Sequence, residues 1–205
     1  MLVLSLTVSV VLAAFTANKS GAVILSFANG LTIKLEPIDS NAAIHIETSN
    51  ASQSGQFAFT SDEFANLSDT TTVNGIKATL YNQNGYVGYK VELKELINNA
   101  ESTIDGSWTN SSGTVTFTPN QSGAKKDWRA ILVVNTTSFP TIACSGQSMT
   151  AKSSAALTKE GSGYNMFTSI TFDGATAHLM DDLAGRKMKL LFTINADTAG
   201  VVSFN

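Results

Sequence analysis

The sequence predicts an all-β fold, a jelly-roll-like or immunoglobulin-like β-sandwich with short helices in its loops and an extended amino-terminal strand. Three observations predict it. Short apolar stretches alternate with polar residues at period two, turn residues recur about every 8–12 residues, and no strand–helix–strand rhythm is present. In this chain of 205 residues, we expect an apolar tail over residues 1–21 and a single sandwich domain over residues 22–205.

The tail carries no charged side chain before Lys19. Ser5, Thr7 and Ser9 fall on one side of a period-two pattern, and large aliphatic residues fall on the other. The aliphatic side consists of Leu2, Leu4, Leu6, Val8, Val10 and Leu12. An isolated strand of this kind has unpaired backbone N–H and C=O groups along its length, so it needs another sheet to receive it.

Three interpretations of the tail stay open. The first is a donor strand that adds to the sheet of a neighbouring subunit, because nine residues span about 30 Å. The second is a secretory signal peptide, although no Lys or Arg follows Met1. The third is a pilin-type helix, although an apolar run of about 17 residues is at the lower limit for a membrane span. We expect the donor strand, with no stable membrane span in the assembled form.

The rest of the domain is predicted to consist of strands and turns. Residues 22–27 are apolar enough for a strand buried on both faces, and Asn29-Gly30 predicts a tight turn before an alternating strand at residues 31–36. The same reasoning predicts strands at residues 43–48, 57–59, 76–82, 86–93, 113–118, 128–135, 166–172 and 187–196. The chain end, residues 200–205, is apolar and is expected to pair in a sheet.

Helices and further turns have weaker signals. Thr60, followed by Asp62 and Glu63, predicts a short capped helix that runs to Leu67. Asn74-Gly75 is predicted to open the strand at residues 76–82, and Asn84-Gly85 to close it. The strand that follows is expected to end as a helical turn by residue 100, and residues 148–163 are expected to form a loop or a weak helix.

The composition limits the partners and the cellular location that we expect for the protein. The net charge is −3, the isoelectric point is about 5.3, and only 14% of residues are charged. No basic tract is present, so nucleic acid is not an expected partner. Abundant Ser, Thr, Asn and Gly together with few charges are typical of secreted and surface β proteins, so we expect an extracellular or cell-surface location.

Residues that carry chemistry are sparse. His45 and His178 each stand alone, and no zinc, nucleophile-elbow or phosphate-loop motif occurs, so we expect no enzyme, no catalytic residue and no metal site. Loop carboxylates leave Ca²⁺ as the one cofactor to consider, but their spacing is not that of an EF-hand and surface acids explain them better: Asp62, Glu63, Asp173, Asp181 and Asp182. Cys144 is expected to be a small buried hydrophobe, with a reactive or intermolecular thiol as the alternative.

Six N-x-S/T sequons are candidate N-glycosylation sites, and most fall in predicted loops or at strand ends. Their asparagines are Asn18, Asn50, Asn66, Asn110, Asn120 and Asn135.

Three stretches resemble the TasA/camelysin family of extracellular fibre subunits. They are Ala-Phe-Thr-Ala at residues 14–17, Ser-Phe-Ala-Asn-Gly-Leu-Thr-Ile-Lys-Leu-Glu-Pro at residues 26–37, and the strand–Asn-Gln-Asn-Gly–strand hairpin of residues 77–91. The resemblance implies a jelly-roll-like sandwich whose amino-terminal strand inserts into the next subunit, as in bacterial matrix fibres and related archaeal pili or threads. Such proteins mature near the Ala-Phe position, whereas an apolar stretch precedes it here, and no zinc motif carries over the metallopeptidase activity described for camelysin.

We therefore expect a structural subunit of an extracellular filament that polymerises head-to-tail by donor-strand complementation, with further copies of itself as partners. Two alternatives stay open. One is a pilin-like subunit with an amino-terminal helical core, and the other is a secreted monomeric adhesion or carbohydrate-binding module.

Overall fold

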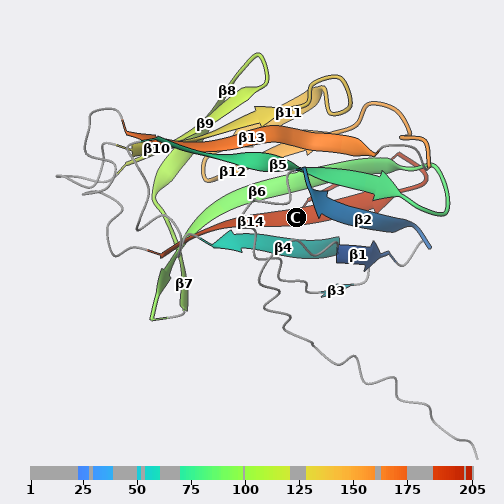
Figure 1. The fold of residues 1–205 in the computed structure, drawn as a ribbon, viewed down its shortest axis with the longest axis horizontal. Helices are drawn as coiled ribbons and strands as arrows, with labels where there is room; N and C mark the ends of the chain where they lie inside the picture. Colours follow the sequence, from blue (N-terminus) through green and yellow to red (C-terminus); the bar gives the residue numbers. More distant parts are fainter. Residues whose placement is uncertain are drawn as a thin grey trace, which may run out of the picture.

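The fold is seen in a computed structural model that describes residues 23–27, 30–38, 50–51, 54–60, 70–98, 100–120, 128–159, 163–174, 187–200 and 202–204 (Figure 1). These residues form strands and turns and contain no helix, which confirms the predicted all-β sandwich. The helix expected after Thr60 and the strand expected at residues 43–48 lie outside the described residues, as does the tail.

Two antiparallel sheets make up the sandwich, and each has seven strands within the described residues. The strands of sheet A, in spatial order, are β1 (Val23–Ser26), β2 (Thr32–Pro37), β5 (Thr70–Leu80), β13 (Tyr164–Gly174), β10 (Trp128–Val134), β9 (Thr114–Pro119) and β8 (Gly106–Ser111). Those of sheet B are β11 (Thr141–Ser145), β12 (Ser148–Lys152), β6 (Tyr86–Ile97), β14 (Lys187–Asp197), β4 (Ser54–Thr60) and β3 (Asn50–Ala51), with β7 (Ala100–Thr103) paired to the far part of β6.

Period-two alternation decides which side chains enter the core. In β2, Ile33 and Leu35 are fully buried, whereas Lys34 and Glu36 between them face outward and form an ion pair. β10 was expected to be a buried core strand, and it does lie inside sheet A, between β13 and β9. Its burial nevertheless alternates, and Arg129 and Val133 are exposed on the outer face.

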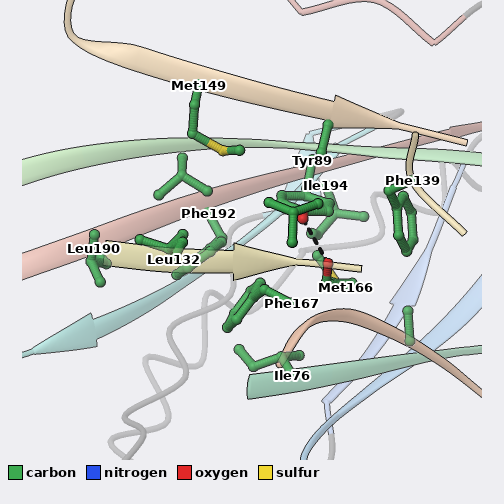
Figure 2. Close-up of a cluster of buried hydrophobic side chains, with 14 of the residues drawn as sticks. Ile76, Tyr89, Leu132, Phe139, Met149, Met166, Phe167, Leu190, Phe192 and Ile194 are labelled. Atoms are coloured by element: carbon green, nitrogen blue, oxygen red, sulfur yellow. Dashed lines mark hydrogen bonds between the residues drawn. The ribbon is translucent and has the colours of Figure 1, made fainter. Parts of the chain in front are cut away.

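Aromatic side chains from both sheets fill the space between them (Figure 2). Phe167 of β13 stacks on Phe192 of β14, with ring centroids 5.1 Å apart. Tyr89 of β6 meets the edge of Phe139 at 5.4 Å, and its hydroxyl donates a hydrogen bond of 2.7 Å to the Met166 carbonyl. The tyrosine is fully buried, so this bond satisfies its one polar group inside an apolar core.

The predicted turn at Gly30 is confirmed, but the turn expected at Asn74-Gly75 is wrong. Gly30 has φ +80° between β1 and β2, whereas Asn74 and Gly75 lie inside the continuous strand β5. Here the glycine serves close packing, because a Cβ at Gly75 would lie 1.7 Å from the Phe167 carbonyl oxygen of β13. The ladder between β5 and β13 shifts register just before Phe167.

Three other local predictions also differ from the structure. β6 continues as a strand to Ile97, because β14 and β7 pair with it there, so the expected helical turn does not form. Residues 148–152 form strand β12 instead of a loop or helix. The described chain end does not pair in a sheet: Val202 packs over Gly88, where a Cβ would lie 2.6 Å from a Val202 methyl group, and Asn195 Nδ2 donates to the Ser203 carbonyl.

Candidate subunit interface at the sheet edges

On one side of the sandwich, β8, which ends sheet A, lies against β11, which ends sheet B. The Trp108 backbone N–H donates to the Gly146 carbonyl at 2.9 Å, and its indole Nε1–H donates to the Gln147 carbonyl at 3.0 Å. The indole is buried against Phe117, with ring centroids 5.2 Å apart. We call this the closed seam.

The opposite ends of the two sheets are β1 and the β3–β4 pair (Figure 1). β1 pairs with β2 only, so its other edge has no strand partner in the described part of the chain. β4 pairs with β14 along its whole length, but on its other edge β3 reaches only Ser54 and Gly55. Residues 56–60 of β4 have no strand partner on this edge among the described residues, and residues 39–49, which precede β3, lie outside them. We call this the open seam.

β1 lacks the usual protection of an exposed edge. It contains no charged residue and no proline, and its ladder with β2 has no register shift. Leu25 faces the core and is 1% exposed, whereas Ile24 on the outer face is 62% exposed. The expectation that residues 22–27 are buried on both faces is thus wrong, because β1 is an edge strand whose outer face meets solvent.

The residues predicted to act as a donor strand lie outside the described residues, so the structure does not place them. They are Leu2, Leu4, Leu6, Val8, Val10 and Leu12. The sequence predicted a strand that needs a sheet edge to pair with, and the fold has two candidate edges, β1 and residues 56–60 of β4. Sequence reasoning missed these edges, since nothing local in residues 23–26 or 56–60 shows that each ends a ladder.

Of the six sequons, some lie outside the described residues and the structure places the others. Asn18 and Asn66 lie outside the described residues, and Asn50 begins β3 beside the open seam. Asn110, at the β8–β9 hairpin, and Asn120, after β9, are both exposed. Asn135 is half-buried, and its Oδ1 accepts the backbone N–H groups of Thr137 and Ser138 at 3.1 and 3.3 Å, so it closes a turn.

The described residues contain no group of three or more potential metal-ligating side chains. Both histidines and four of the five carboxylates considered for Ca²⁺ lie outside them, and Asp173 falls in β13. Cys144 is partly buried against the core, and burial raises the pKa of its thiol, so the reactive thiolate form is disfavoured. No helix within the described ranges is long and apolar enough to cross a membrane.

Comparison of the chain with known protein families, with curated proteins and with solved structures finds no match.

Proposed function

We propose that this protein is a structural, non-catalytic subunit of an extracellular filament, in which the amino-terminal tail of one copy adds as a strand to the open seam of the next. The observation that carries the proposal is the open seam itself, where two sheet edges end without a described strand partner. Each unpaired edge presents N–H and C=O groups that a strand can bind, and the tail has the same need.

The apolar side of the tail supplies the affinity. Burying Leu4, Leu6, Val8 and Val10 at about 1.5–3 kcal/mol each gives roughly 6–12 kcal/mol before the ordering costs of association. The ladder hydrogen bonds set the register and add a smaller net term. Because tail and seam are different surfaces, the contact is heterologous, and it builds a fibre where the rotation between successive copies does not close a ring.

A pair of matched variants tests the proposal. Replacing Leu6 and Val8 by Asp puts two charges on the apolar side, while replacing Ser5 and Thr7 by Asp puts the same charges on the polar side. We expect the first variant to stay folded and monomeric and the second to form fibres, as seen by electron microscopy and by near-UV circular dichroism of the soluble fraction. Equal fibre yields from both variants contradict the proposal.

The intact mass of subunits recovered from native fibres is the accompanying measurement. Donor-strand assembly requires residues 2–10 in the assembled subunit, so the mass must include them. Fibres built from subunits that lack this segment rule out the proposed function. The same spectrum shows whether any sequon carries a glycan.

A further inference from the structure

Two of the six sequons lie entirely within the described residues, and the fold treats them differently. One is Asn-Ser-Ser at residues 110–112, and the other is Asn-Thr-Thr at residues 135–137. Both match the N-x-S/T motif, so the sequence alone does not separate them. The structure does, because the first lies at the tip of a hairpin and the second in a turn that contacts this hairpin.

The first sequon is presented to solvent at the tip of the β8–β9 hairpin. Asn110, Ser111 and Ser112 are all exposed. The chain turns through Ser112 and Gly113, whose φ values are +51° and +89°. The Asn110 Oδ1 accepts the Gly113 backbone N–H at 3.1 Å, so the side chain is held at the turn. An enzyme that approaches from solvent therefore meets this asparagine on a defined, exposed turn.

The second sequon is held within the fold. Asn135 is half-buried, its backbone N–H donates to the Met166 carbonyl of β13 at 3.2 Å, and its own carbonyl accepts the Phe139 N–H at 2.9 Å. Its Oδ1 accepts two further backbone N–H groups, those of Thr137 and Ser138. The backbone and the carboxamide of this residue are therefore both fixed. A transferase cannot draw the sequon out of the fold without breaking these hydrogen bonds.

The hairpin also crowds the second sequon. The Val134 N–H donates to the Gly113 carbonyl at 2.8 Å, so the hairpin turn is tied to the residue just before Asn135. A Cβ at Gly113 would lie 2.5 Å from the Thr136 methyl group, which shows how closely the middle residue of the second sequon packs against the hairpin. This contact limits the space around Asn135 and leaves Asn110 exposed.

We propose that Asn110 carries an N-linked glycan in the mature protein and that Asn135 does not. The donor is a lipid-linked oligosaccharide phosphate. The Asn110 Nδ2 forms a bond to the anomeric carbon of the sugar and loses one proton, while the bond from that carbon to the phosphate oxygen breaks and the lipid phosphate leaves. A glycan is bulky and needs a surface position, which the hairpin tip provides.

The glycan is compatible with the proposed function, with which this inference shares only the extracellular location. β8 is the last strand of sheet A, at the opposite end of the sheet from β1. A glycan on Asn110 therefore lies on the side of sheet A away from the β1 edge.

Glycopeptide mass spectrometry of the native protein tests the assignment. Trypsin cleaves after Lys125 and Arg129, between the two asparagines, so each is read from its own peptide. Fragmentation then separates Asn110 from Asn120, which share a peptide. We expect a glycan on Asn110 and only the unmodified form of Asn135. An unmodified Asn110, or a glycan on Asn135, overturns the inference.

Matched variants, produced in the organism that makes the protein, give a second readout. Asn110→Gln and Ser112→Gly both destroy the first sequon, and glycine accepts the positive φ of residue 112. Each should lower the intact mass by one glycan, whereas Asn135→Gln should leave the glycan mass unchanged. Equal mass losses from Asn110→Gln and Asn135→Gln contradict the inference.

The two proposals fail in different ways. Fibres that assemble through the tail but carry a bare Asn110 overturn this inference alone. A subunit that is glycosylated at Asn110 but forms fibres equally well with Asp at residues 6 and 8 contradicts the proposed function alone.

Discussion

At the closed seam, the backbone N–H of Trp108 in β8 donates to the carbonyl of Gly146, in the turn that follows β11, and the Trp108 indole both packs on Phe117 and donates to the Gln147 carbonyl. At the open seam, β1 (Val-Ile-Leu-Ser) is more apolar than β8 (Gly-Ser-Trp-Thr-Asn-Ser), but neither β1 nor residues 56–60 of β4 have a described strand partner on their outer edge. The seams thus differ both in described backbone hydrogen bonds and in apolar content. An edge covered within the subunit contributes to stability, and an edge left uncovered is available for assembly.

Breaking the closed seam should have the largest effect on stability. Trp108→Ala removes a side chain that is 3% exposed, so we expect a loss of about 3–5 kcal/mol in the free energy of unfolding. Denaturant titration of the monomer measures it. Trp108→Phe is the matched control, because it keeps an aromatic ring on Phe117 while it removes the N–H donor and part of the indole volume, and its loss should be smaller. Equal losses would show that an aromatic ring on Phe117 is not what holds this seam together.

A change in the core between the seams should have an intermediate effect. Tyr89→Phe removes the hydroxyl that donates to the Met166 carbonyl, but this carbonyl keeps the Asn135 backbone N–H as a donor at 3.2 Å, so we expect a cost of about 0.5–1.5 kcal/mol. Burial also raises the pKa of Tyr89 well above its usual value, so the unfolded chain ionises first, and stability falls as the pH rises above about 10. Denaturant titrations between neutral and alkaline pH should show a steeper fall for the unmodified protein than for Tyr89→Phe, and parallel curves contradict this account.

The open seam should tolerate change best. Ile24→Thr keeps a β-branched residue on the exposed outer face of β1, so the free energy of unfolding should stay within about 0.5 kcal/mol of the unmodified value. Its neighbour Leu25 faces the core, and Leu25→Ala should cost about 2–5 kcal/mol by the same denaturant titration. A large loss for Ile24→Thr would mean that the outer face of β1 is covered within the monomer, and the contrast between the seams would not hold.

Much of the fold was predictable because burial at period two is a local property. The strands at residues 31–36 and 187–196 were expected from alternation and the strand at residues 128–135 from an apolar run, and they match β2, β14 and β10 closely. The strands that sequence reasoning missed, β3, β7, β8, β11 and β12, are short and rich in polar residues. Each pairs with a strand next to it in the chain, which supplies a backbone ladder in spite of the polar sequence, and β12 also pairs with the distant β6, as when Thr150 pairs with Lys90.

The candidate interface was likewise predictable only in part from the sequence. Composition and period by themselves determined an all-β sandwich and an uncharged, alternating tail, because side-chain chemistry and spacing are written along the chain. Only the tertiary structure decided that β1 and β3 end their sheets, that Ile24 faces solvent, and that Gly75 makes room for a neighbouring strand instead of a turn. Whether a backbone edge is paired depends on where every other strand lies, and no short stretch of sequence carries that information.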